Sequence, residues 1–65
     1  MDMTTALKNA AINAASTVRL TPYGVAHDLA HETIREVADV LGGWLPSNVV
    51  FDEKEFRGIR VNPRD

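Results

Sequence analysis

The amino-acid sequence predicts a mainly α domain: an antiparallel helical hairpin, about residues 5–18 and 22–41, followed by a short C-terminal β-hairpin or irregular segment. Apolar residues recur at helical spacing in both N-terminal ranges, and a Gly-Gly pair ends the second range. Beyond it, apolar and polar residues alternate with a period of two, as in strands. An α+β domain is therefore the open alternative to a purely helical one.

The chain has 65 residues, so we expect one small domain over residues 1–65, with 1–4 and 62–65 frayed. It has no cysteine, which excludes disulfides and thiolate metal ligands. A chain of this length buries only about 60% of the surface that its unfolded form exposes. We therefore expect it to gain stability by self-association or by docking onto a partner.

The composition is that of a globular protein, with 45% hydrophobic and 25% charged residues. Seven Lys and Arg against nine Asp and Glu give a net charge of −2, which disfavours nucleic-acid binding because such proteins carry basic patches. No apolar run is long enough to span a bilayer, and the first residues do not resemble a signal peptide. We expect a cytoplasmic protein that does not bind membranes.

The first predicted helix runs from about Thr5 to Val18, with Thr4 or Thr5 as its N-cap. Its apolar face is mostly alanine: Ala6, Leu7, Ala10, Ala11, Ala14, Ala15 and Val18. Alanine favours the helix but buries little apolar area, and small residues allow another helix to approach closely. The sequence therefore predicts self-association through Leu7, Ala10, Ala11, Ala14 and Val18.

The second helix has clearer predicted ends. Thr21 followed by Pro22 predicts an N-cap with proline at the first helical position. Gly42 and Gly43 predict a left-handed C-cap. The apolar face expected to pack on the first helix is wide: Val25, Ala26, Leu29, Ala30, Thr33, Ile34, Val37, Val40 and Leu41.

The segment after Gly43 favours a hairpin with a three-residue loop at 53–55. That register pairs Phe51 with Arg57 and Val49 with Ile59. It places four apolar residues on one face: Val49, Phe51, Ile59 and Val61. The open alternative is a short helix, with capping and terminating residues Asp52, Glu55 and Gly58.

The aromatic residues divide into core and surface candidates. Trp44 is expected to fold back on the end of the second helix, and both Trp44 and Phe51 are expected in the core. Tyr23 and Phe56 fall at the edges of elements, where an aromatic side chain can anchor a partner.

His27 and His31 are four residues apart on a predicted helix, the spacing of the first half of many zinc sites. There is no third histidine, and Arg35 lies one turn further on, where its charge opposes a dication. We interpret both as helix-flank residues, with His31 closer to solvent, and expect no cofactor. A metal ion held by both histidines at a subunit interface and a pH-responsive contact are the alternatives.

Acidic residues recur along one sector of the second helix: Asp28, Glu32, Glu36 and Asp39. Like charges four residues apart mildly destabilise a helix, so this acidic stripe is a candidate surface for a basic partner. The alternative is an ordinary solvated face of the helix. The C-terminal end is basic: Lys54, Arg57, Arg60 and Arg64. It could meet the acidic stripe of a second copy or contact phosphates.

No catalytic triad or phosphate-binding glycine loop is present in the sequence. The main hypothesis is a non-enzymatic protein–protein interaction module that forms homo-oligomers. It would be an inhibitor, adaptor or assembly subunit, of the kind that small phage and mobile-element genes encode. The predicted partner-binding residues are Tyr23, Asp28, Glu32, Glu36, Asp39 and Phe56. The alternatives are a small DNA-binding regulator, which the four carboxylates disfavour, and the interfacial metal site.

Overall fold

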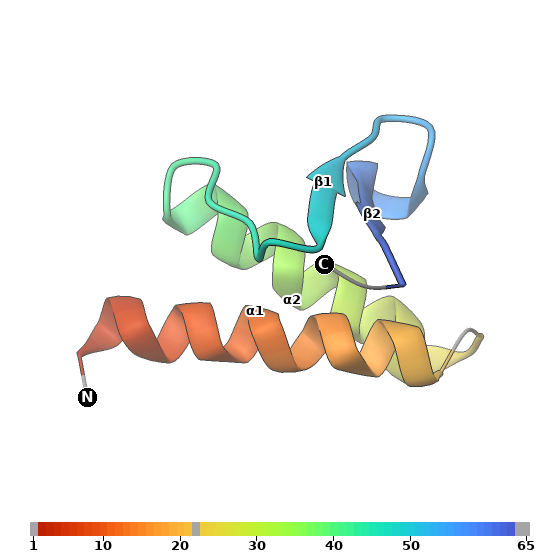
Figure 1. The fold of residues 1–65 in the computed structure, drawn as a ribbon, viewed down its shortest axis with the longest axis horizontal. Helices are drawn as coiled ribbons and strands as arrows, with labels where there is room; N and C mark the ends of the chain where they lie inside the picture. Colours follow the sequence, from red (N-terminus) through yellow and green to blue (C-terminus); the bar gives the residue numbers. More distant parts are fainter. Residues whose placement is uncertain (1, 22, 64–65) are drawn as a thin grey trace.

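The computed structural model describes residues 2–21 and 23–63. Helices α1 (Met3–Leu20) and α2 (Val25–Val40) precede strand β1 (Val49–Phe51), a single helical turn η1 (Phe56–Gly58) and strand β2 (Ile59–Val61). The two helices run antiparallel to each other, and the C-terminal segment packs on one side of the pair (Figure 1). The predicted helical hairpin with a C-terminal β-hairpin is confirmed.

Helix α1 begins earlier than predicted because Asp2 is its N-cap. The Asp2 carboxylate accepts a hydrogen bond from the backbone N–H of Thr5 at 2.7 Å. The predicted caps Thr4 and Thr5 lie inside the helix instead. The backbone hydrogen bond from Thr5 lowers the pKa of Asp2 below its ordinary value, since it stabilises the charged form.

The predicted start of the second helix is wrong. Thr21 ends α1: its backbone N–H and its hydroxyl both donate to the carbonyl of Thr17, at 2.9 and 2.6 Å. Helix α2 begins at Val25, after Gly24 with a φ of 105°. Such a positive φ favours glycine. The predicted role of Pro22 falls outside the described residues.

The predicted C-cap of α2 is confirmed. Gly42 and Gly43 have φ values of 70° and 100°. The N–H of Gly43 donates to the carbonyl of Ala38 at 2.7 Å, which is the Schellman pattern. The chain then reverses along the helix pair toward β1 (Figure 1).

The hairpin has a different register from the predicted one. Val49 lies opposite Val61, and Phe51 lies opposite Ile59 rather than Arg57. The connection is longer than predicted because Arg57 and Gly58 both adopt positive φ, 58° and 74°. The N–H of Asp52 closes this connection by donating to the carbonyl of Gly58 at 2.8 Å. Of the short helix that was the alternative to the hairpin, only the single turn η1 (Phe56–Gly58) forms.

The core lies where α1, α2 and the hairpin meet. Its buried members are mostly small: Ala14, Ala15, Val18, Ala30, Ile34, Val49 and Ile59. Leu45 and Val61 pack against it, and Trp44 is half-buried with the Lys8 ammonium 5.3 Å from its ring centroid. Phe51, expected in the core, is 53% exposed, with the Arg35 guanidinium 5.6 Å from its ring centroid.

The buried face of α2 differs from the predicted apolar face. His31 is buried, whereas Val25, Leu29 and Val40 are exposed. The reason is that the C-terminal segment packs on the histidine side of α2, at η1, and leaves the other flank uncovered.

Candidate partner-binding surface

The histidines join α2 to the C-terminal connection. Their ring centroids are 4.5 Å apart, and the ring of Phe56 packs edge-on against His31 at 5.5 Å. Nδ1 of His31 lies 3.2 Å from the carbonyl oxygen of His27; because a carbonyl only accepts, this nitrogen carries the proton. His31 is 5% exposed, so the prediction that it lies closer to solvent was wrong.

The histidine pair has few potential metal ligands around it. Across residues 2–21 and 23–63, no group of three or more His, Cys, Asp or Glu side chains could hold a metal ion. Nδ1 of His27 is buried without a hydrogen-bond partner in the described part of the chain. The contact that the structure does show is between the rings of His31 and Phe56, and it packs the connection between the strands onto α2.

The acidic stripe and the basic end meet within one chain. Arg57 of the connection donates to Glu32 of α2 at 3.4 Å, and its guanidinium lies 5.5 Å from the Phe56 ring centroid. Arg60 pairs with Asp52 at 3.0 Å. Because these pairs are solvent-exposed, each contributes at most about 1 kcal/mol. Glu32, Arg57 and Arg60 therefore already form ion pairs within the chain.

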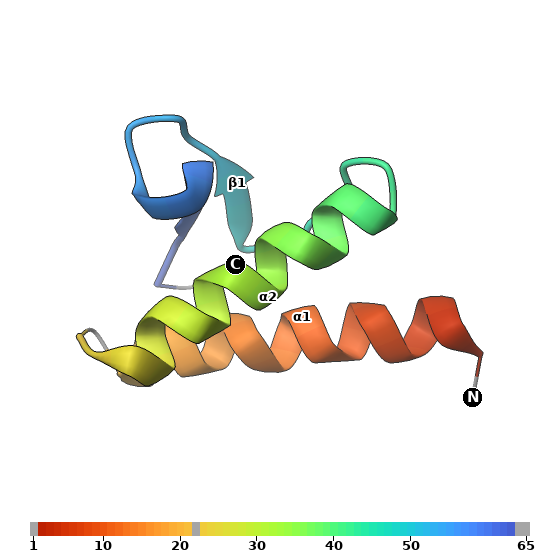
Figure 2. The same ribbon diagram turned by 180° about the vertical axis from the view of Figure 1, so that it is seen from behind.

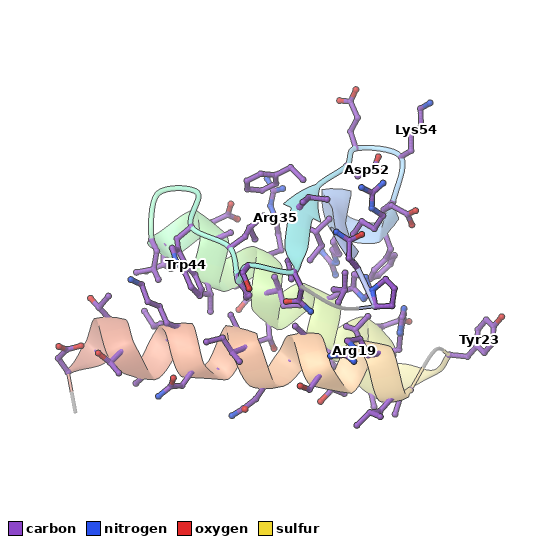
Figure 3. The ribbon with its side chains drawn as sticks, viewed as in Figure 1. Arg19, Tyr23, Arg35, Trp44, Asp52 and Lys54 are labelled. Atoms are coloured by element: carbon purple, nitrogen blue, oxygen red, sulfur yellow. The ribbon has the colours of Figure 1, made fainter. Side chains whose placement is uncertain are left out.

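The remaining charges are distributed unevenly. Asp39 pairs with Arg35 at 3.3 Å, whereas Asp28 and Glu36 form no ion pair with any described residue. Lys54 points away from the molecule (Figure 3). Arg64 of the predicted basic end lies outside the described residues.

Comparison of the chain with protein-family models, with curated proteins and with solved structures finds no match. Within the described residues, no helix has the length and apolar character needed to cross a membrane.

Three strongly exposed apolar side chains lie close together in sequence at the bend between the helices. Leu20, Tyr23 and Val25 are 81%, 90% and 74% exposed, and we call them the turn-end cluster. Figure 3 shows Tyr23 projecting from this end of the molecule. The sequence identified Tyr23 from its position at an element edge. It missed Leu20, because α1 was expected to end before it, and Val25, which was assigned to the packing face.

A depression of about 460 Å³ adjoins the turn-end cluster. It contains Leu20 of the cluster and reaches across α1 and α2 to the residues after β2; its lining is Val18, Arg19, Leu20, His27, Val61 and Pro63. These mostly apolar walls can accommodate a side chain of a docked protein.

The residues predicted for self-association are mostly inside the molecule. Ala11, Ala14 and Val18 are buried in the chain's own core region, and Leu7 is half-buried. Of that set only Ala10 is exposed. Phe56, predicted to bind a partner, has about half of its surface exposed, and its ring lies between His31 and Arg57.

Proposed function

We propose that the chain is a non-enzymatic protein–protein interaction module that binds its partner through the turn-end cluster. The observation that carries the proposal is the contrast between this cluster and the core. Three apolar side chains within six residues of chain are at least 74% exposed, while the largest fully buried side chains are Ile34 and Ile59. Exposed apolar groups that adjoin one another are typical of binding sites, and tyrosine is enriched among the residues that dominate binding energy.

The partner has an apolar pocket for Tyr23 with lysine or arginine at its rim. Asp28 lies in the first turn of α2, close in sequence to the cluster, and its carboxylate is exposed without an ion pair among the described residues. A basic rim would therefore be attracted to this end of the molecule.

A role as inhibitor, adaptor or assembly subunit fits this surface better than a chemical role. The side chains most capable of chemistry are engaged in holding the fold: His31 packs under Phe56, and Arg57 pairs with Glu32. Such a module acts by occupying a surface of its partner.

The test is photo-crosslinking in the native host, with a photoreactive phenylalanine derivative in place of Tyr23. The matched control carries the same derivative in place of Lys54, which is exposed on the connection between the strands. We expect one major protein adduct from position 23 and none of that mass from position 54. Adding Asp28→Lys should reduce the yield at least several-fold. Identical adducts from both positions, or no adduct from position 23, would contradict the proposal.

A further inference from the structure

A pocket of about 380 Å³ lies between α1 and the segment that leads from α2 into β1. That segment returns along α1 on the near side of the helix pair (Figure 1), and α2 lies on the far side, in front in the view from behind (Figure 2). Small-molecule sites have volumes of about 300–1,000 Å³, so this pocket has the size of one. Its lining comes from both sides: Ile12, Ala15, Ser16 and Arg19 of α1, with Pro46, Ser47 and Asn48 of the segment.

The polar lining of this pocket can donate hydrogen bonds, and none of its residues is acidic. The guanidinium of Arg19 forms no ion pair with any described residue, and the hydroxyls of Ser16 and Ser47 form no hydrogen bond with one. Figure 3 shows Arg19 on α1, toward the end of the helix that leads to Tyr23. Arginine stays charged and holds its N–H groups in a planar fork that matches the oxygens of an oxyanion. The pocket therefore favours an anionic group.

Asn48 adds a buried amide to the wall of the pocket. It is 9% exposed, and its side-chain nitrogen donates a long hydrogen bond of 3.5 Å to the carbonyl of Asn62. In return, the backbone N–H of Asn62 donates to the carbonyl of Asn48 at 2.8 Å. These two bonds tie the wall to the residue that follows β2. Because an amide nitrogen carries two hydrogens, Asn48 retains one N–H for an oxygen of a ligand.

The charge around the pocket favours a carboxylate over a phosphate. Among the described residues that line it, Arg19 is the only basic one. It lies in the last turn of α1, where the negative end of the helix dipole disfavours a doubly charged anion. Phosphate sites commonly use backbone N–H groups at a helix N-terminus, whereas this pocket lies along the C-terminal half of α1. A carboxylate carries one charge and pairs with a single guanidinium through two parallel hydrogen bonds.

The rest of the lining is apolar and extends away from Arg19. Ile12 precedes Arg19 by seven residues, which is about 10 Å along a helix, and it is 48% exposed. Ala15 and Pro46 complete this part of the pocket. A ligand whose carboxylate pairs with Arg19 can therefore place an apolar chain against Ile12. Covering that side chain removes apolar surface from water, which favours binding.

We propose that this pocket binds a small monocarboxylic acid with an apolar chain. Arg19 pairs with the carboxylate, to whose oxygens the hydroxyls of Ser16 and Ser47 and the amide of Asn48 also donate. The chain lies against Ile12 and its apolar neighbours. The site uses no residue of the turn-end cluster, so this inference goes beyond the proposed function and does not depend on it.

The test is titration of the full chain with hexanoate at neutral pH and constant ionic strength, followed by amide chemical shifts. Three probes separate the contributions: hexanol has the chain without the charge, acetate has the charge without the chain, and inorganic phosphate has a second charge. We expect saturable shifts at the polar pocket residues, with a Kd for hexanoate of about 1 mM or lower. Hexanoate should bind at least tenfold more tightly than each of the other three.

Substitutions assign the binding to this pocket. Arg19→Gln should weaken hexanoate binding at least tenfold, because it removes the positive charge. Arg60→Gln is the matched control, since Arg60 is an exposed arginine of β2 that does not line the pocket, and it should bind like the wild type. Ile12→Ala should weaken the binding of hexanoate but not that of acetate. Circular dichroism verifies that each variant keeps its helices.

An absence of saturable shifts up to about 20 mM hexanoate, well above a millimolar Kd, would overturn the proposal. Equal affinities of the Arg19→Gln and Arg60→Gln variants would do the same, as would phosphate binding more tightly than hexanoate. Shifts confined to Leu20 and Val61 would place the acid in the depression beside the turn-end cluster and would also overturn it. Crosslinking from position 23 needs no carboxylic acid, so the two proposals can fail separately.

Discussion

Asp2 determines where the first helix begins. Its carboxylate accepts the hydrogen bond from Thr5, and the lowered pKa means that folding favours the charged form. A group whose pKa is lowered by folding stabilises the folded state above its unfolded pKa, and this contribution disappears as the pH falls through the folded pKa. The stabilisation is therefore complete at neutral pH and is lost in acid.

We expect amide-exchange protection in the first turn of α1 to fall as the pH is lowered below about 4, the ordinary range of aspartate. Asp2→Asn is the control, because asparagine caps helices about as well and does not titrate. If the Asn variant loses protection over the same pH range, Asp2 is not the responsible group. Exchange rates are corrected for their intrinsic pH dependence before comparison.

His31 is the residue whose environment the sequence predicted least well. On a helical wheel it lies away from the apolar centre, yet it is buried because Phe56 returns from the C-terminal connection to cover it. No local pattern carries that information, since Phe56 is 25 residues further along the chain. The contact depends on the conformation of residues 52–58. Within this segment Arg57 has a left-handed backbone conformation, which cannot be predicted from its residue type.

His31→Ala should lower the free energy of unfolding by about 1–3 kcal/mol, because it leaves a cavity between α2 and Phe56. The measurement is urea denaturation followed by circular dichroism. Glu36→Ala on the exposed side of the same helix should change stability by less than about 0.5 kcal/mol. Equal effects would show that the His31 contact contributes nothing specific.

At the scale of elements, α2 was predicted better at its end than at its start. Two consecutive glycines after an apolar helical pattern have few uses other than a left-handed cap, and Gly42 and Gly43 form one. Thr21 and Pro22 fit an N-cap equally well by residue type. Thr21 instead closes α1, since its amide and hydroxyl both bond to Thr17.

Gly42→Ala should cost about 1 kcal/mol of stability, the price of a left-handed conformation for a residue with a Cβ. A Cβ at this position would meet no atom within 4 Å, so steric clash with neighbours adds nothing. Gly42→Asn should cost less, because asparagine tolerates this conformation. Thermal unfolding of the two variants measures the difference; an alanine variant as stable as the wild type would contradict the capping role.

At the scale of the whole molecule, the core is completed by the last strand. Ile59 has no exposed surface and packs with Val49, Ile34 and the alanines of α1. The predicted apolar hairpin face was correct for Val49 and Ile59 but not for Phe51, which is 53% exposed although it lies opposite the buried Ile59. The helices therefore depend on residues near the end of the chain.

Ile59→Ala should destabilise the whole domain by about 2–4 kcal/mol, whereas Arg60→Ala, beside it on the exposed side of β2, should cost at most about 1 kcal/mol. Helical circular dichroism and Trp44 fluorescence should report a single coincident urea transition for each variant. Separate transitions for the two probes would show that the helices fold without the hairpin.

The surface proposals show what a linear pattern leaves undecided. The sequence predicted Tyr23 and Asp28 as surface candidates, and both are exposed. It also indicated a wide apolar face on α2, and the structure leaves Val25, Leu29 and Val40 of that face exposed. Which part of that face remains open follows from the side on which the C-terminal segment packs, and only the folded chain decides it.

Asp2 and Tyr23 lie at opposite ends of α1, about 27 Å apart by the length of an 18-residue helix. A dye, resin linkage or carrier protein joined near Asp2 would consequently stand clear of the projecting tyrosine. If the molecule is immobilised near Asp2, Tyr23 faces away from the support, which is the orientation that a biosensor surface requires.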